Sequence, residues 1–331
     1  MTETLLSWLH LPEPWGTLLL FAAGLLLIIK GGDWFVDAAS WIAGVTGIPK
    51  FIVGATIVSL ATTLPELLVS CIATAEGNNE IAVGNAVGSV TANVGLIMAI
   101  SIAILPMVMK DNDIFVKGCI MMGTTALLGI LCMNGSLNVW EGLLLLAVLA
   151  AFTYMNVHTA RVHMGTQAEK EPPTHAVRNI LKFIIGAGAI VAGAQLLVDN
   201  GAALAGFFGV SEKLIAVTMV AIGTSLPEFV TTITALAKKE PGMSLGNIVG
   251  ANIIDMTLIL PVCAMVSGGK LTVPAAGAKL PSLVTLDIPV TLGLMALAVL
   301  PTLYGRKFRR WQGVLMGVLY FGYIGIVAFV L

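Results

Sequence analysis

The sequence predicts an all-α integral membrane protein with ten transmembrane helices, arranged as two five-helix halves of inverted topology. Three observations lead to this prediction: an apolar composition, ten apolar stretches of membrane-spanning length, and a pair of motifs that recurs at a fixed spacing. Of the 331 residues, 57% are hydrophobic and only 11% are charged, whereas soluble proteins carry roughly a quarter charged residues. The net charge of −1 leaves no basic surface for nucleic acid.

The apolar stretches match the thickness of a bilayer. A helix needs about 20 apolar residues to cross a hydrocarbon core of about 30 Å. Ten such stretches lie near residues 16–43, 50–75, 80–105, 115–133, 138–157, 178–206, 212–237, 242–267, 282–304 and 310–331. The polar segment 158–177 then separates an N-terminal half, 1–157, from a C-terminal half, 178–331. Residues 1–15 contain no Lys or Arg, so no signal peptide is predicted.

A pair of motifs occurs once in each half. Residues 61–66 read Ala-Thr-Thr-Leu-Pro-Glu and residues 84–89 read Gly-Asn-Ala-Val-Gly-Ser. The second copy reads Gly-Thr-Ser-Leu-Pro-Glu at 223–228 and Gly-Asn-Ile-Val-Gly-Ala at 246–251. Adding 162 to any position of the first copy gives its partner in the second, without a gap. Chance does not produce such agreement, so the chain contains an internal repeat.

The basic residues predict how the chain is oriented. If the N-terminus faces outward, the inner loops and helix ends collect Lys50, Lys110, Lys117, Arg161, Lys170, Arg178, Lys182, Lys238, Lys239, Arg306, Lys307, Arg309 and Arg310. The outer side collects only Lys213, Lys270 and Lys279. The positive-inside rule therefore predicts that both termini lie outside and that 158–177 is cytoplasmic. A compact chain of this kind is most typical of a bacterial inner membrane.

The repeat and the orientation together predict an inverted topology. Five helices, an odd number, separate each residue from its repeat partner, so the two halves cross the membrane in opposite directions. Inverted repeats of this kind are common among secondary transporters, whose binding sites lie near the bilayer midplane.

The motifs place acidic side chains in the middle of predicted spans. Glu66, Glu228 and Asp255 lie there, and Asn93 is the repeat partner of Asp255. An ionised carboxylate near the membrane midplane costs several kcal/mol, so its compensating partner must be found. The natural partner of several acids at one depth is a cation.

Each motif glutamate follows a proline, Pro65 or Pro227. A proline removes a backbone donor and clashes with the carbonyl four residues earlier, so we expect each helix to break or kink just before its glutamate. We expect the freed carbonyls, including those of Ser59 and Ala221, to face a cavity. Each glutamate should then lie in the first turn of the following half-helix, and the antiparallel helices should bring the two glutamates together.

All of the candidate donor atoms are oxygens. They belong to the side chains of Glu66, Glu228, Asp255, Asn93, Thr62, Thr63, Thr224, Ser225 and Ser89, and to the carbonyls of Ser59 and Ala221. This set suits hard cations such as Ca²⁺ and Na⁺, and no His or Cys cluster indicates zinc or copper. An enzyme is not predicted, because the chain lacks the HExxH and GxSxG motifs. No cofactor is expected, and one monomer suffices for the site.

These motifs resemble the two alpha-repeats of the cation/calcium exchanger superfamily, and most closely those of prokaryotic sodium/calcium exchangers. The resemblance is specific within 54–97 and 216–259. It implies that the paired glutamates bind Ca²⁺ and that Na⁺ occupies the neighbouring hydroxyl and carbonyl positions. It also implies that the first and sixth helices slide to expose the site to alternate sides. The chain is therefore expected to exchange Ca²⁺ for Na⁺ across a lipid bilayer.

Departures from the family pattern leave alternatives open. The family's Gly-Ser-Asn appears as Gly-Ser-Val at 88–90 and as Gly-Ala-Asn at 250–252, so one hydroxyl is missing at Ala251. Sodium as the counter-ion is therefore less secure than calcium, and Asp255 opposite Asn93 leaves a potassium or proton role open. A cation channel could use the same acids, but two inverted broken helices favour alternating access.

Two further charged positions remain outside this site. Asp37 and Asp199 are repeat partners that lie late in spans one and six. A helix-end or gating role is favoured for them over a role as ion ligands. Lys30 could pair with Asp33 or extend toward the membrane surface, and the sequence does not decide between these.

Overall fold

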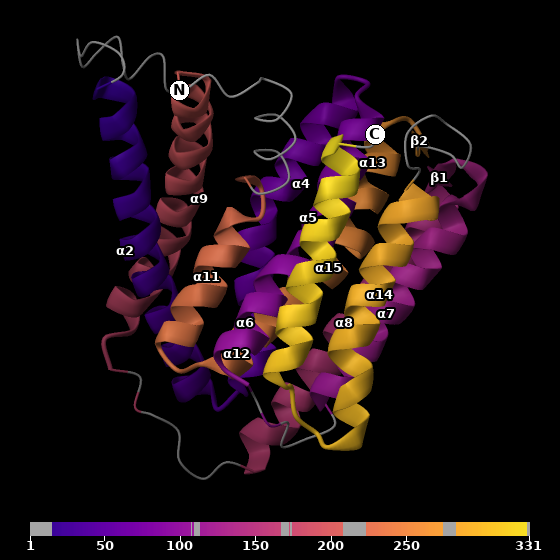
Figure 1. Ribbon diagram of the computed structural model, residues 1–331. Helices are drawn as coiled ribbons and strands as arrows, with labels where there is room; N and C mark the ends of the chain where they lie inside the picture. The colour runs from indigo at the N-terminus through magenta and orange to yellow at the C-terminus, as the bar shows by residue number, and fades with distance from the viewer. Residues whose placement is uncertain are drawn as a thin grey trace.

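The computed structural model describes residues 15–106, 108, 113–166, 172, 174–207, 223–273 and 283–329. These residues form a bundle of long helices that run roughly side by side (Figure 1). The helices and strands are α2 (Trp15–Thr46), α3 (Lys50–Val53), η1 (Gly54–Val58), α4 (Ser59–Ala75), α5 (Asn79–Ala92), η2 (Asn93–Met98), α6 (Ala99–Ile104), α7 (Asp113–Leu131), η3 (Cys132–Asn134), β1 (Ser136–Asn138), α8 (Val139–Thr166), α9 (Ala176–Phe207), α11 (Leu226–Ala237), α12 (Pro241–Ile254), η4 (Asp255–Ile259), α13 (Leu260–Val266), β2 (Lys270–Thr272), η5 (Leu283–Asp287), α14 (Ile288–Val299), η6 (Leu300–Tyr304) and α15 (Arg310–Phe329).

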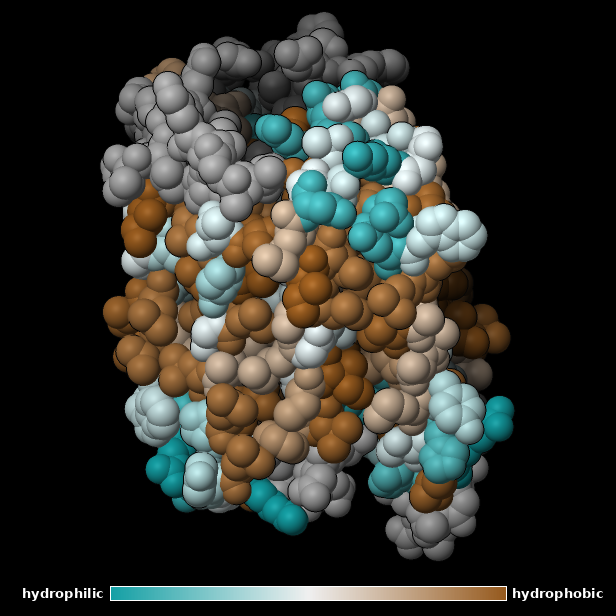
Figure 2. Space-filling model, turned by 90° about the vertical axis from the view of Figure 1, so that its right-hand side faces the viewer, coloured by the Kyte–Doolittle hydropathy of each residue, from teal (hydrophilic) through white to brown (hydrophobic). Residues whose placement is uncertain are grey.

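Among the described residues, eight helical stretches are long and apolar enough to cross a membrane. They are 15–46, 50–75, 79–104, 114–134, 139–163, 176–204, 241–266 and 283–304, and each coincides with a span that the sequence predicts. Figure 2 shows the corresponding hydrophobic belt around the middle of one face, with hydrophilic residues gathered above and below it. The prediction of a helical integral membrane protein is confirmed.

Two of the ten predicted spans are not among these eight stretches. Of the span predicted at 212–237, only residues from 223 onward are described, and they hold the 12-residue helix α11. The last predicted span contains α15, a helix of 20 residues.

The sequence predicted neither the position at which α8 ends nor a small β-ribbon. Helix α8 continues to Thr166, into the polar segment predicted as a linker. Residues 158–164 contain no proline or glycine that would end the helix earlier. Strands β1 and β2 pair antiparallel, with Leu137 opposite Leu271. This short ribbon joins the loop after α7 to the loop after α13.

Helices α2 and α9 stand together at one edge of the bundle (Figure 1). Their backbones meet at glycines: a Cβ atom added to Gly31 would lie 2.8 Å from Ala189 Cβ, and one added to Gly186 would lie 2.8 Å from the carbonyl oxygen of Gly31. Gly193 meets the carbonyl of Gly24 in the same way, at 2.8 Å. Small residues at such contacts let membrane helices approach closely.

In the described residues, wide π-helical turns interrupt three of the spans, and a fourth, η5, begins the span that contains α14. One of them, η2, begins at Asn93, and another, η4, begins at Asp255, which is the repeat partner of Asn93. The third, η1, lies just before the first motif. Since π-helical turns are frequent at functional sites, their start at Asn93 and Asp255 indicates the same candidate site residues as the repeat does.

The expected helix break occurs in the second motif but not in the first. Ser225 caps α11, and Pro227 and Glu228 lie in its first turn, as predicted. Helix α4 instead runs through Pro65 without interruption, so the prediction of a half-helix starting at Glu66 is wrong. A proline inside a helix removes one hydrogen bond without forbidding the helix, and here the distortion lies just upstream, in η1.

The packing of α2 on α9 can be tested with two glycines of the same helix. We expect Gly186→Val to destabilise the protein by about 1–3 kcal/mol, because the new side chain would overlap the α2 backbone. Gly188→Val is the matched control, since nothing lies within 4 Å of a Cβ atom there. Thermal unfolding of the purified protein in detergent measures the difference, and equal melting temperatures for the two variants would contradict this packing.

Candidate functional site

The two motif copies meet in the middle of the bundle. Glu66 on α4, Glu228 on α11 and Asp255 at the start of η4 each have only 1% of their surface exposed. The hydroxyl of Thr63 donates to Glu228 Oε1 at 3.4 Å, which links the first copy directly to the second. Glu66 also interacts electrostatically with Glu228 and Asp255. Three carboxylates from both halves therefore share one buried region, as the sequence predicts.

Hydroxyl and amide groups surround these acids and again join the two copies. Ser89 Oγ lies 3.3 Å from Thr224 Oγ1, and the hydroxyl of Thr62 donates to Asn247 Oδ1 at 3.4 Å. Ser89, Thr62 and Asn247 are all buried. The contacts between segments more than a hundred residues apart show that the site is shared by both halves of the chain.

Many buried polar atoms in this region have no hydrogen-bond partner among the described residues. They are Glu66 Oε1 and Oε2, Glu228 Oε2, Asp255 Oδ1, Asn93 Oδ1 and Nδ2, and Ser225 Oγ. A buried polar group without a partner costs about 1–3 kcal/mol, and more when it is charged. All but one of these atoms are oxygens, so a cation is the occupant that would satisfy them.

Most of the donors beside the three acids are neutral. In the described part of the chain, no group of three or more His, Cys, Asp or Glu side chains could hold a metal ion by itself. The remaining donors are neutral hydroxyl and amide groups, which bind hard cations less tightly than a cage of carboxylates does. Such a mixed set can both bind and release an ion.

The other predicted donors lie in or beside the same region, with one outside the described residues. The Ser59 carbonyl accepts hydrogen bonds from the hydroxyls of Thr63, at 2.7 Å, and Thr62, at 3.3 Å. Asn93, Ser89 and Ser59 are buried, whereas Thr224 is partly exposed. Ala221 is not among the residues that the structure describes, so its predicted carbonyl ligand stays a prediction.

Two asparagines belong to the site although the ligand prediction omitted them. Asn85 Nδ2 donates to Ser70 Oγ at 2.9 Å and to the carbonyl of Glu66 at 3.4 Å. Its repeat partner Asn247 accepts the hydroxyl of Thr62. Asn85 thus fixes the backbone of the α4 glutamate, and Asn247 links α12 to α4. Their identical place in both motif copies was the signal that could have identified them.

A cavity of about 250 Å³ reaches the motifs from one side. Pro65 and Asn85 line it from the first half, and Gln195, Thr224 and Pro227 line it from the second. The cavity therefore borders both motif prolines and the partly exposed residue Thr224.

Comparison with protein families agrees with this geometry. The family model described as sodium/calcium exchanger protein matches residues 16–157 and 179–329. The chain belongs to the sodium/calcium exchanger family. The match falls into two parts, and the polar segment that the sequence predicts as a linker lies between them.

Individual relatives of this exchanger cover nearly its whole length. A putative antiporter CaxA of Alkalimonas amylolytica is 32% identical over 91% of this chain and 95% of its own. Sodium/calcium exchanger MaX1 of Methanosarcina acetivorans is 28% identical over 94% of this chain and 98% of its own. The solved structure of the sodium-calcium exchanger NCX_Mj, soaked with Na⁺ and Sr²⁺, superposes with a TM-score of 0.81 at 29% identity and covers 93% of this chain and 98% of that one.

Proposed function

We propose that this exchanger moves Ca²⁺ in one direction and Na⁺ in the other, by alternating access to the buried site between the two motif copies. The observation that carries the proposal is the pair of buried glutamates, Glu66 and Glu228, because three of their four carboxylate oxygens lack partners among the described residues. Membership of the sodium/calcium exchanger family supports the same ions.

The proposed ion ligands follow from the oxygen atoms around these glutamates. Ca²⁺ binds between Glu66 and Glu228, because a divalent cation best compensates two carboxylates. Na⁺ uses the neutral oxygens around them with help from the acids. These ligands are Thr62, Thr63, Thr224, Ser225, Ser89, Asn93 and Asp255, with the carbonyls of Ser59 and Ala221.

The two ions compete for the same carboxylates, so the site holds either Ca²⁺ or Na⁺. Helices α2 and α9, which correspond to the first and sixth predicted spans, move against the rest of the bundle and expose the loaded site to one side at a time. A ligand shifts that equilibrium only through its differential affinity for the two states. Helices α2 and α9 lie together at the edge of the bundle, and this position supports their movement separately from the other helices (Figure 1).

The proposed architecture is ten helices in two inverted repeats, with halves 1–157 and 178–331 around the segment 158–177. The constant offset between the motif copies supports it. So do the π-helical turns at the partner residues Asn93 and Asp255 and the two-part family match.

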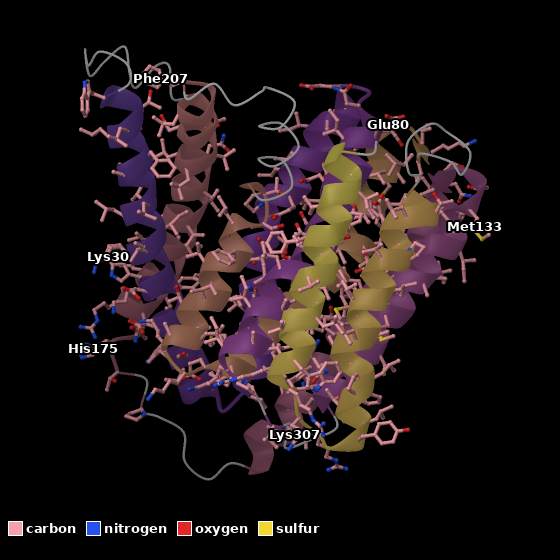
Figure 3. All side chains as sticks on the ribbon, viewed as in Figure 1. Lys30, Glu80, Met133, His175, Phe207 and Lys307 are labelled. Carbon is pink, nitrogen blue, oxygen red and sulfur yellow. The ribbon has the colours of Figure 1, made fainter. Side chains whose placement is uncertain are left out.

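We propose that the protein lies in a bacterial inner membrane with the 158–177 segment in the cytoplasm. The charge distribution supports this orientation under the positive-inside rule. In Figure 3, His175 and Lys307 lie toward one end of the bundle, whereas Glu80, Met133 and Phe207 lie toward the other.

Calcium uptake into proteoliposomes tests the proposed function. Vesicles loaded with Na⁺ and diluted into Na⁺-free buffer should take up radiolabelled Ca²⁺, and vesicles with only a proton gradient should not. Glu66→Gln should reduce uptake to background because it removes a carboxylate from the site. Glu80→Gln, at an exposed acid of α5, should leave uptake unchanged. Uptake in Glu66→Gln at the wild-type rate would refute the assignment, and uptake driven by protons alone would refute sodium as the counter-ion.

The missing hydroxyl at Ala251 can be restored. In the structure, Ser89 lies beside Thr224, whereas the repeat equivalent of that pair is Ala251 and Thr62, which can share no hydroxyl contact. A net hydrogen bond or ligand contact is worth about 1 kcal/mol, so Ala251→Ser should lower the Na⁺ concentration for half-maximal exchange by about fivefold. Ala264→Ser, in the buried face of α13, is the control. An unchanged sodium titration would show that this hydroxyl plays no part.

A further inference from the structure

The edge formed by α2 and α9 carries a groove that the proposed transport cycle does not use. It has a volume of about 750 Å³ and is lined by Trp34, His175, Arg178, Leu181, Lys182 and Ile185, among others. None of the described residues that line it is acidic. Figure 3 shows Lys30 and His175 at this same edge of the molecule. The groove therefore combines an apolar wall with an excess of positive charge.

The charged and apolar residues of the groove lie on one side of α9, at its N-terminal end. Arg178 and Lys182 are four residues apart and lie near the start of the helix, so they share one face. Leu181 lies one residue before Lys182 on the same side of the helix, and Ile185 lies almost one turn beyond Lys182, with 50% and 53% of their surface exposed. Basic side chains at a helix end lie at the depth of lipid headgroups, whereas the apolar residues beyond them lie at the depth of acyl chains.

We propose that this groove binds one anionic phospholipid. Its phosphate contacts Arg178 and Lys182, and an acyl chain lies along Leu181 and Ile185 against the indole ring of Trp34. Charge decides the class of lipid, because a groove whose described lining holds basic residues and no acid favours a headgroup with net negative charge over a zwitterionic one. Since Trp34 belongs to α2 and the other contacts to α9, the lipid joins the two helices.

Lipid-dependent melting in nonionic detergent tests this site. Phosphatidylglycerol should raise the melting temperature of the protein, whereas phosphatidylcholine with the same acyl chains should not. The double variant Arg178→Gln/Lys182→Gln should lose the shift, with phosphatidylglycerol affinity falling about tenfold or more. The double variant Arg309→Gln/Arg310→Gln removes two basic residues elsewhere and should keep it. Equal shifts from both lipids, or a shift retained in Arg178→Gln/Lys182→Gln, would overturn the proposal.

Lipid analysis supplies a second measurement that does not depend on melting. Wild-type protein purified from a membrane that contains phosphatidylglycerol should retain this lipid, and the Arg178→Gln/Lys182→Gln variant should retain much less of it. Equal retention in the two proteins would also overturn the proposal.

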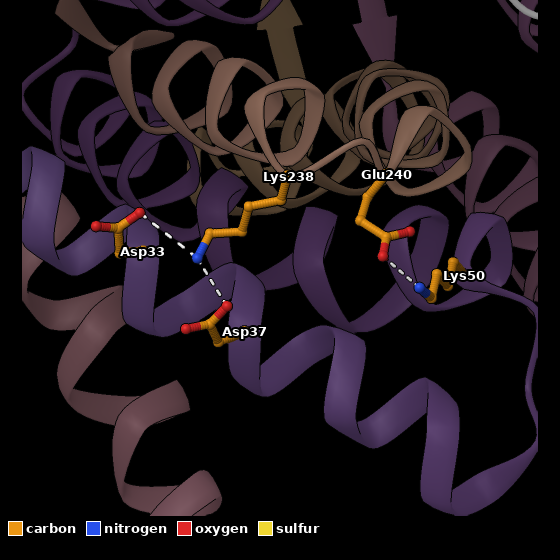
Figure 4. A network of polar contacts seen from close by, with 5 residues as sticks. All are labelled: Asp33, Asp37, Lys50, Lys238 and Glu240. Atoms are coloured by element: carbon orange, nitrogen blue, oxygen red, sulfur yellow. Dashed lines mark hydrogen bonds and ion pairs between the residues drawn. The ribbon is translucent and has the colours of Figure 1, made fainter.

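A different observation concerns the other side of α2. Lys238, which caps the end of α11, lies 2.7 Å from Asp37 and 3.5 Å from Asp33, both on α2 (Figure 4). On the same turn of chain, Glu240 forms an ion pair with Lys50 at the start of α3. Three lysine–carboxylate contacts, made by two lysines, therefore fasten α2 and α3 to the turn between α11 and α12.

The equivalent positions of the repeat carry a different set of charges. Adding 162 to Asp33 and Asp37 gives Gln195 and Asp199, and subtracting 162 from Lys238 gives Glu76. Gln195 donates to Asp199 within α9 at 2.7 Å. The lysine that attracts two acids in one half is thus an acid in the other, where it would repel Asp199.

We infer that Asp33, Asp37 and Lys238 form a latch that holds α2 against α11 at one side of the membrane. This inference rests on the proposed alternating access, in which α2 moves relative to the bundle. In an inverted repeat the equivalent contact lies at the opposite side, and there Glu76 and Asp199 cannot form it. The latch therefore favours the state that is closed at the Lys238 side. Its side chains are 27% and 49% exposed at Lys238 and Asp37, so the bias is modest, about two- to fivefold in population.

Hydrogen exchange of the backbone amides tests the latch without measuring transport. Lys238→Gln should raise exchange in the 33–46 part of α2 by about two- to fivefold, whereas Lys238→Arg should keep the wild-type pattern. Lys239→Gln, at the neighbouring exposed lysine, is the control. Wild-type exchange in Lys238→Gln, or equal changes in Lys238→Gln and Lys239→Gln, would overturn the latch. If the predicted exchange pattern appears but no variant transports calcium, the proposed function fails and the contact itself stands.

Discussion

The structure depends on holding acidic side chains inside a membrane protein without a counter-charge among the described residues. Glu66, Glu228 and Asp255 are buried together, and several of their oxygens lack partners in the described part of the chain. Burying charge in this way is stable only when an ion compensates it. The close helix packing around the site follows from the same need, because donors must reach the ion from both halves. Gly250 allows this, since a Cβ atom there would lie against the carbonyl of Ala55.

Neutral oxygens make the compensation reversible. Hydroxyls such as those of Thr63 and Ser89 already contact groups of the opposite half, at 3.4 Å from Glu228 and 3.3 Å from Thr224. These long contacts cost little to exchange for an ion, because hydrogen bonds at such distances are weak. A site whose polar groups were all satisfied by short hydrogen bonds would be stable without a bound ion. The partial satisfaction of this site links the binding of an ion to the stability of the whole bundle.

Much of the architecture could be predicted from the sequence because apolarity and spacing are local properties. The span boundaries follow from runs of apolar residues, and the site residues follow from the repeat. The uninterrupted course of α4 through Pro65 could not be predicted, because whether a proline breaks a helix depends on the packing around it. The roles of Asn85 and Asn247 and the contact of Lys238 with Asp37 depend on which distant segments meet. No local pattern in a single sequence shows which distant segments come into contact in the folded protein.

The departures from perfect repetition have a physical consequence of their own. If the two halves were identical in sequence and inverted in the membrane, the states open to either side would have equal free energy by symmetry. Ser89 against Ala251, Asn93 against Asp255 and Glu76 against Lys238 remove that equality. Under the proposed function, the first two pairs change how strongly an ion is held from each half, and under the proposed latch the third changes which side of the bundle is held shut. The fold can therefore work in both directions, and a small number of side chains sets the preferred resting state.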